Sequence, residues 1–406
     1  MSLSSSVSAQ PQKRVLENTE LMLNAAVDVL AQEGIAHFNL SRVSQYLGKS
    51  LKIVRDRVKT PEELLLLTWK SRLAPLVLTK LETLRAAVRD VKNPKSRESF
   101  LEICEYFVSD APEVRALAEV LVISYYTPSL RAAIDQTFAE HGFASGNHVE
   151  NQDEKLRLAF AKMLVLGLML NSRSPRALAE SHRDGLLLRW FALTHLAQAQ
   201  PRLGVPADHM DVEPVLDEND SELNVLLQTT LSLVSERGFN GVTVVEIAKA
   251  SGHSEGYVFA RYQTKLELYQ DATRRQMAVG FALNEKYWQE IEKLGGMGRA
   301  DAEYYIEALK PHRNRARIQS LEQLRLAWHD AGMFLAATEE TTRFRQALLE
   351  KPHWAEIETE SDFFLNICLG QGALLLPVLF PTAHELAWDR VTVPLWDAML
   401  KRAESN

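Results

Sequence analysis

The chain has 406 residues, of which 46% are hydrophobic and 24% are charged, and its net charge is −7. Its 18 glycines and 15 prolines are few for this length, which favours helices and excludes collagen-like and low-complexity proteins. Two cysteines, Cys104 and Cys368, are too few for a disulfide scaffold or a four-cysteine zinc site. We expect an all-α globular protein of about two to four domains, with no cofactor and no metal.

Neither the N-terminal segment nor the most apolar segment of the chain indicates an export signal or a membrane span. Residues 1–12 are polar and serine-rich, which predicts a disordered tail and lacks the apolar centre of a signal peptide. The most apolar segment, 363–380, contains polar residues and a proline, which favours a buried helix over a membrane span. The sequence therefore predicts a cytoplasmic protein.

Charge is distributed unevenly along the chain. Residues 1–210 carry 26 basic and 23 acidic side chains, whereas residues 211–406 carry 20 and 30. Six basic residues and one acid fall within 41–59, so a local basic patch interrupts an otherwise acidic protein.

A segment of about 45 residues occurs twice, at an offset of 204 residues. Gly34 corresponds to Gly238, and the register continues without a gap for thirty further positions. The matching pairs include Leu40 and Val244, Val43 and Ile247, Gly48 and Gly252, Ser50 and Ser254, Val54 and Val258, Arg57 and Arg261, Thr60 and Thr264, and Glu63 and Glu267. Weaker matches continue to the end of the chain, so we interpret it as one unit of roughly 200 residues that is duplicated.

The second copy begins with a helix over 223–237, where apolar residues recur at the helical period. Gly238 follows, at a position suited to a left-handed C-terminal cap. Thr243 and Glu246 have the spacing of a capping box, which predicts the start of a second helix.

A glycine-containing turn follows this second helix. Gly252 can supply the positive φ of a tight turn, and Ser254 is a plausible N-cap for a short third helix that runs through Tyr262. Thr264 and Glu267 form another capping box and start a fourth helix. Two short helices joined by such a turn, with a helix on each side, predict a helix-turn-helix head.

The segment 222–269 resembles the TetR family of transcriptional regulators, and 18–65 resembles it more weakly. The residues that carry the resemblance are Gly238, Phe239, Val242, Thr243, Val244, Ile247, Ala248, Ser251, Gly252, Ser254, Gly256, Tyr257, Val258, Phe259, Arg261, Tyr262, Lys265, Leu268 and Tyr269. The resemblance implies a three-helix head that binds DNA. It also implies a larger helical domain that binds a small-molecule effector and dimerises through its last two helices.

The duplication and the resemblance together predict the domain organisation. We expect a tail at 1–12, a first head at 13–65, a first regulatory domain at 66–200, a linker at 201–221, a second head at 222–269 and a second regulatory domain at 270–406.

Transferred to this chain, the family's DNA contacts fall at the starts of the second and fourth helices and along the third. The implied residues of the second head are Thr243, Ser254, Glu255, Gly256, Tyr257, Phe259, Arg261 and Lys265. Helix N-termini with free N–H groups attract phosphates, and Lys265 adds a positive charge there. Phe259 stands where the family usually has tyrosine, and Glu255 would repel phosphates unless it accepts from a cytosine amino group.

The first head has lost family residues and gained charge. Pro61 replaces the lysine that begins the fourth helix, while basic residues crowd the third. We nominate as its DNA-binding residues Lys49, Ser50, Lys52, Arg55 and Arg57, with Lys59 beside them. Two interpretations compete, a basic DNA-binding head with altered specificity and a structural copy whose charges are merely solvated. The clustering at the expected recognition helix favours DNA.

Each regulatory domain ends in two apolar helices, predicted at 156–170 and 182–196 and at 363–376 and 385–399. These pairs either pack on each other within one chain as a pseudo-dimer or form the core of their own halves. Aromatic residues that could line an effector pocket are Tyr125, Tyr126, Phe138, Trp288, Tyr304, Tyr305, Trp328 and Phe334, although helical spacing is more typical of core.

Motifs for nucleotide binding, metal binding and catalysis are missing, so we do not expect an enzyme. The sequence predicts a transcriptional repressor that binds a double-stranded DNA operator and is released by a small-molecule effector. It would act as an intramolecular pseudo-dimer or a homodimer, without a membrane partner. The alternative is a ligand-binding or protein-interaction module whose heads no longer bind DNA specifically.

Overall fold

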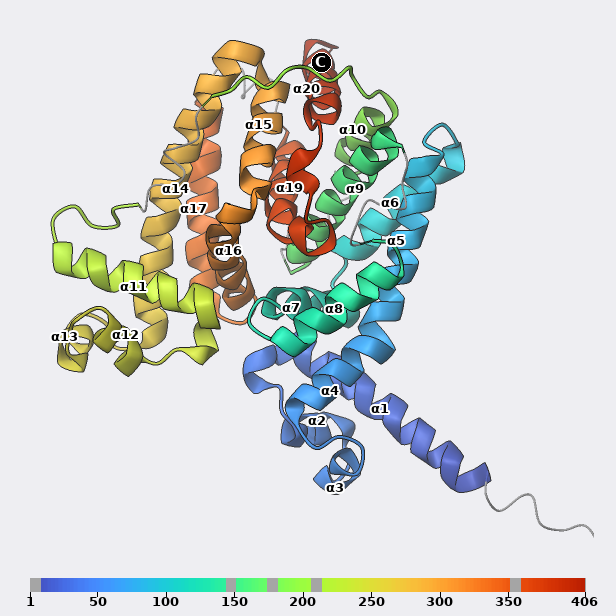
Figure 1. Cartoon of the computed structure of the whole chain (residues 1–406), viewed down its shortest axis with the longest axis vertical. Helices are drawn as coiled ribbons and strands as arrows, with labels where there is room; N and C mark the ends of the chain where they lie inside the picture. Colours follow the sequence, from blue (N-terminus) through green and yellow to red (C-terminus); the bar gives the residue numbers. More distant parts are fainter. Residues whose placement is uncertain (1–8, 144–150, 174–181, 206–213, 351–358, 406) are drawn as a thin grey trace, which may run out of the picture.

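A computed structural model describes residues 9–143, 151–173, 182–205, 214–350 and 359–405. Within these ranges the chain is helical and has no β-strand, which confirms the predicted all-α fold class. Two groups of helices, α1–α3 and α11–α13, each with one long and two short helices, project from a larger helical body (Figure 1). We call α1–α3 the first head and α11–α13 the second head.

The first half of the chain contains ten α-helices among the described residues. They are α1 (Ala9–Glu33), α2 (Leu40–Leu47), α3 (Leu51–Arg55), α4 (Pro61–Thr68), α5 (Ala74–Arg89), α6 (Pro94–Val108), α7 (Pro112–Ile123), α8 (Pro128–Glu140), α9 (Gln152–Leu170) and α10 (His182–Thr194). Four of these begin with proline, whose missing N–H costs nothing at a first helical position. A π-helical turn, Trp69–Leu73, joins α4 to α5 just before Pro75, which cannot donate to the helical ladder.

The second half follows a similar order, except that its fourth helix is continuous. Its elements are α11 (Ser221–Arg237), α12 (Val244–Ala250), α13 (Glu255–Phe259), α14 (Lys265–Gly295), α15 (Met297–Leu309), α16 (Asn314–Ala327), α17 (Ala331–Leu349), α19 (Glu360–Leu379) and α20 (Asp389–Ser405).

The two halves meet along α9 and α19, which pack against each other over their length. Gly167 and Gly372 allow the two backbones to touch. A Cβ on Gly167 would lie 1.7 Å from the carbonyl oxygen of Cys368, and one on Gly372 would lie 1.7 Å from that of Met163. The helix α10 in turn packs on α20 and α19, so the last two helices of each half form one four-helix arrangement.

A buried ion pair reinforces this contact. The guanidinium of Arg189 in α10 donates to Asp362 in α19 at 2.7 Å, and both side chains are fully buried. Arg189 also donates to the side-chain oxygen of Asn366 at 2.7 Å. Buried charges need such partners because burial without them is costly.

One hydrophobic core contains residues from both halves, whereas the second head has a smaller core of its own. The first head joins the main core through α1, whose Met22, Ala26 and Leu30 are completely buried. The two heads are therefore attached to a single packed body.

Several predicted boundaries need correction. α1 begins at Ala9, so the last four residues of the predicted tail are helical, and residues 1–8 lie outside the described ranges. Residues 206–213 of the predicted linker also lie outside them. The third helix of the second head ends at Phe259, short of Tyr262, and α20 begins at Asp389 because a 3₁₀ turn occupies the preceding segment.

One described helix, α19, is long and apolar enough to cross a bilayer. However, 67% of its most apolar window is buried inside the protein, which agrees with the predicted buried helix.

Candidate nucleic-acid interface

Local backbone signals shape the second head as the sequence predicts. Gly238 adopts a φ of 71°, although its extended ψ of 160° differs from a left-handed cap. The predicted capping box is present, because the Thr243 hydroxyl accepts from the N–H of Glu246 and the Glu246 carboxylate accepts from the N–H of Thr243. These contacts fix the start of α12.

The turn between α12 and α13 also follows the prediction. Gly252 has a φ of 77°, where a side chain would be strained, and Ser254 caps α13 by accepting from the N–H of Tyr257 at 3.2 Å. Ile247 and Val258 are buried on the inner sides of the two helices. The opposite face of the short α13 is consequently left at the surface.

Most of the predicted contact residues lie on this surface. Exposed members are Thr243, Ser254, Glu255, Gly256, Phe259 and Arg261, while Tyr257 and Lys265 are partly buried. They come from the N-terminal ends of α12 and α14, from α13 itself and from the turn before α14. Phe259 is 52% exposed, which is unusual for a large apolar side chain and suits contact with thymine methyl groups.

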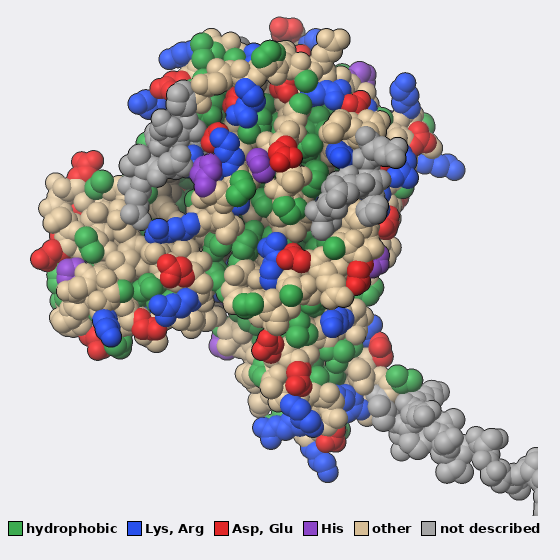
Figure 2. Space-filling model, in the orientation of Figure 1, with side chains coloured by type: hydrophobic (Ala, Val, Ile, Leu, Met, Phe, Trp, Pro, Cys, Tyr) green, Lys and Arg blue, Asp and Glu red, His purple; other side chains and the backbone are tan. Residues whose placement is uncertain are grey.

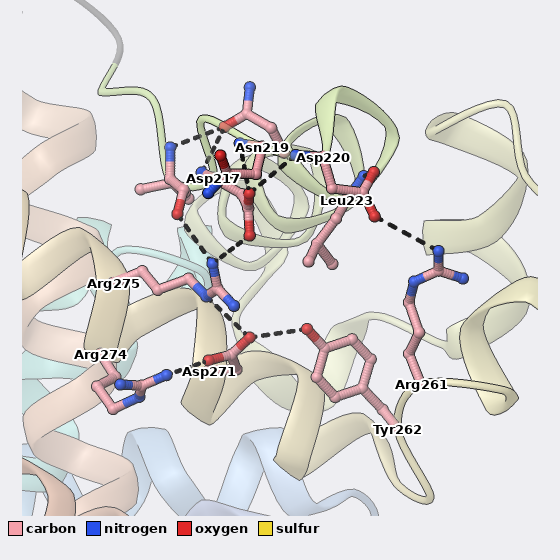
Figure 3. A network of polar contacts seen from close by, with 11 residues as sticks. Asp217, Asn219, Asp220, Leu223, Arg261, Tyr262, Asp271, Arg274 and Arg275 are labelled. Carbon is pink, nitrogen blue, oxygen red and sulfur yellow. Dashed lines mark hydrogen bonds and ion pairs between the residues drawn. The ribbon is translucent and has the colours of Figure 1, made fainter.

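Arg261 is held in place but remains accessible. Its guanidinium lies over the ring of Tyr257, 3.7 Å from the centroid. It also donates to Asp220 at 3.5 Å, as Figure 3 shows. The side chain is still 35% exposed. A phosphate or base would compete with Asp220 for this guanidinium.

A polar network fixes the turn that carries Arg261 (Figure 3). The hydroxyl of Tyr262 donates to Asp271 at 2.8 Å, and Arg275 donates to Asp271 at 3.0 Å and to Asp217 at 2.6 Å. Burial would raise the pKa of Asp271, but hydrogen bonds from Arg274, Tyr262 and Arg275 hold the pKa below its usual value. The segment before α11 and the start of α14 are thereby joined.

Lys265 has a structural contact that the sequence did not indicate. Its ammonium donates to the carbonyl oxygens of Phe239 and Val242, at 2.7 and 2.6 Å, and lies over the Phe239 ring. Burial lowers the pKa of this lysine. In this structure Lys265 supports the loop between α11 and α12, and its predicted contact with phosphate would require it to leave these carbonyls.

The first head repeats the backbone features of the second. Gly34 and Gly48 have φ values of 71° and 65°, Asn39 caps α2 by accepting from Arg42, and Thr60 caps α4 by accepting from Glu63. The side chains that it exposes are different.

Basic side chains gather on the first head, at the lower tip of the molecule in Figure 2. Ser50, Lys52, Arg55 and Lys59 are exposed. Lys49 instead donates to Asn18 and Arg57 to the hydroxyl of Thr19, so both point toward α1. Lys52 and Arg55 therefore offer the most accessible charge among the nominated residues.

Two surface residues of the second head were not among the contact residues predicted from the sequence. Val245 is 53% exposed, and Lys249 lies one helical turn further along the same face of α12. The signal was present, because the helical period that buries Ile247 and Ala248 turns these two residues outward.

The aromatic residues named as possible pocket walls contribute to packing. Tyr305 stacks edge-on with Trp388, Phe138 with Trp69, and Trp328 donates to the Leu170 carbonyl at 3.1 Å. A cavity of about 680 Å³ lies instead at the surface of the first head. Its lining residues are Gln32, Glu33, His37, Asn39, Ser41, Arg42, Gln45 and His329.

Comparison with known proteins agrees with the geometry of the second head. Residues 226–272 match the family described as bacterial regulatory proteins, tetR family. No curated protein matches the chain. The match covers most of α11, all of α12 and α13, and the start of α14. Residues 226–272 are therefore a helix-turn-helix DNA-binding domain of the kind found in tetR-family regulators.

Proposed function

We propose that the chain is a transcriptional regulator whose two unlike heads bind one DNA duplex, with the two halves acting as an intramolecular pseudo-dimer. One observation carries the proposal. Both heads have positive-φ glycines at corresponding turns and a side-chain cap at the start of the second helix, and both are attached to a body in which α9 packs on α19. These features support the proposal that a single chain presents two helix-turn-helix surfaces.

The heads differ in the chemistry that they offer to DNA. The second exposes Phe259, Val245 and Arg261, which suit contacts with base edges, while the first exposes Lys52 and Arg55, which suit phosphates. We propose that the second head supplies most of the sequence specificity and the first supplies mainly salt-dependent affinity.

The proposal extends to regulation. The regulator would be a cytoplasmic repressor without catalytic activity, and a small-molecule effector bound in the helical body would change how the heads meet DNA. A coupling free energy of about 1–3 kcal/mol between effector and DNA is enough for such control.

The decisive experiment is selection of bound fragments from a random DNA pool at about 0.15 M salt. An enriched asymmetric motif with two unlike half-sites is the expected result. Enrichment of a palindromic motif would instead indicate an intermolecular dimer that uses one type of head, and would overturn the pseudo-dimer. If nothing is enriched, the alternative of a ligand-binding or protein-interaction module replaces the proposal.

Changing Lys52 and Arg55 to alanine together should weaken binding to all sequences alike. Each phosphate contact that is lost lowers the slope of log affinity against log salt by about 0.9, so the double variant should lose about 2. Fluorescence anisotropy over a salt series measures this slope. Lys92→Ala with Lys95→Ala, two exposed lysines on the body, is the matched control and should leave the slope unchanged. An unchanged slope in the head variant would show that its charges are merely solvated.

The variant Arg261→Ala should reduce affinity for the selected motif and relax sequence preference. The expected loss is about 1–3 kcal/mol, typical of an arginine that contacts a base. Arg97→Ala removes an exposed arginine of the body, which pairs with Glu98 on α6, and serves as the control. Equal affinity of the Arg261 variant and the wild type would remove Arg261 from the interface.

A further inference from the structure

A buried ionic cluster joins the two halves of the chain near the bases of the heads. Arg325 in α16 donates to both carboxylate oxygens of Glu322 at 2.7 and 2.8 Å, and to Glu119 in α7 at 3.0 Å. None of the three side chains is more than 3% exposed. Since α7 belongs to the first half and α16 to the second, Arg325 connects them.

Each carboxylate also holds the backbone at the base of one head. Glu119 accepts from the N–H of Ile35 at 2.9 Å, and Glu322 accepts from the N–H of Phe239 at 2.6 Å. Ile35 and Phe239 directly follow Gly34 and Gly238, the positive-φ residues at which the chain turns from the first helix of each head toward the second. A continuous path of hydrogen bonds, buried at its centre and partly buried at both ends, therefore runs from one head to the other.

Each of these two glycines packs against a residue from the other half of the chain. A Cβ on Gly34 would lie 2.5 Å from Nε2 of His329, and a Cβ on Gly238 would lie 3.2 Å from the ring of Tyr126. His329 follows α16 and Tyr126 follows α7, so each half closes on the head of the other. His329 also contacts Glu119 at 3.2 Å.

The cluster is asymmetric although its surroundings repeat. Glu119 and Glu322 occupy corresponding positions, 203 residues apart, but the position that corresponds to Arg325 is Val122. One arginine thus serves two carboxylates. Burial would raise the pKa of Glu119, but Arg325, His329 and the Ile35 N–H hold that pKa below its usual value.

We propose that Arg325 is a positioning residue that fixes the separation of the two heads. Resting on the function proposed above, it thereby sets the spacing of the two DNA half-sites that one chain can bind. Without the guanidinium, each head would remain anchored to its own helix, but the hydrogen-bond path from Glu119 to Glu322 would be broken.

The test variant combines Glu119→Gln, Arg325→Met and Glu322→Gln. Each glutamine keeps an acceptor for its backbone N–H, and no unpaired buried charge remains, so this variant is expected to fold. A circular dichroism spectrum equal to that of the wild type verifies the fold. Arg97→Met, which removes an exposed ion pair with Glu98, is the control.

Head separation is measured by pulsed dipolar spectroscopy between spin labels at Asp56→Cys and Ala260→Cys, exposed positions that end α3 and α13. Cys104 and Cys368 are buried, and burial raises the pKa of both thiols, so they resist labelling. The wild type and the control should each give one narrow distance distribution, and the triple variant a broader one. An equally narrow distribution centred at the wild-type distance in the triple variant would overturn the proposal.

A second measurement uses duplexes that carry the selected half-sites with the spacer lengthened or shortened by about half a helical turn. Two linked contacts gain about 10²–10⁴-fold over one when the geometry fits. The wild type should lose this gain on altered spacers, whereas the triple variant should depend little on spacer length and bind single half-sites as the wild type does. If neither protein binds any duplex, the proposed function fails while the distance measurement still decides the role of Arg325.

Discussion

Replacing Arg325 alone with methionine should destabilise the protein by about 3–5 kcal/mol, because Glu119 and Glu322 remain buried without the guanidinium that they share. The two carboxylates would then repel each other in a site that excludes water. Urea unfolding followed by circular dichroism gives the difference in unfolding free energy between the variant and the wild type.

The triple variant described above separates charge from packing in this experiment. It lacks the arginine as well, but its glutamines carry no charge, so its loss should be much smaller than that of Arg325→Met. Arg97→Met should cost about 0–1 kcal/mol, as is usual for an exposed pair. Equal losses in the single and triple variants would mean that Arg325 contributes by packing rather than by its charge.

The pH dependence of this loss has a definite sign. In the wild type the pKa of Glu119 is lowered, so the carboxylate contributes stability above its unfolded pKa of about 4.3 and loses it as the pH falls through the folded value. Without Arg325, burial is expected to raise the pKa of Glu119 above its unfolded value. Stability is then lost as the pH rises from about 4.3 through the raised folded pKa. The difference in unfolding free energy between Arg325→Met and the wild type should therefore become smaller as the pH is lowered from about 7 to about 4.

The local structure of the second head was predictable because its signals lie close together in sequence. The cap made by Thr243, the turn at Gly252 and the cap made by Ser254 each depend on residues within four positions. Such contacts form in the same way whatever the rest of the chain does. The all-α class was predictable from the composition of the chain, and the burial of α19 from its apolar sequence, because neither depends on knowing which distant segments meet.

Contacts between distant segments were not predictable from the sequence. Glu119 and Arg325 are 206 residues apart, and nothing in the sequence near either residue indicates the other. Likewise, the ammonium of Lys265 binds carbonyl oxygens that only the folded loop brings within reach. The dipeptide Leu166-Gly167 recurs as Leu369-Gly370 at an offset of 203 residues, whereas the close approach of α9 and α19 involves Gly167 and Gly372. A sequence repeat shows which positions correspond between the two copies. It does not show at which positions two helices touch, because that depends on how their side chains pack.

That crossing leads to the second large effect. Gly372→Ala should destabilise the protein by about 3 kcal/mol or more, because the new Cβ would lie 1.7 Å from the Met163 carbonyl oxygen, and backbone cannot move aside as a flexible side chain can. The helices α9 and α19 would have to separate, and the buried pair of Arg189 with Asp362 beside them would lose its geometry. Thermal unfolding followed by circular dichroism measures the loss.

Gly370→Ala provides a control on the same helix, two residues away. Nothing lies within 4 Å of the Cβ that it would add, so alanine should leave packing intact and stabilise α19 by about 0.5–1 kcal/mol through its better helix propensity. Opposite signs for the two substitutions would locate the contact between the halves at Gly372. If both variants unfold at the temperature of the wild type or above it, the two helices do not approach each other closely at Gly372, and the packing of α9 on α19 could no longer support the intramolecular pseudo-dimer.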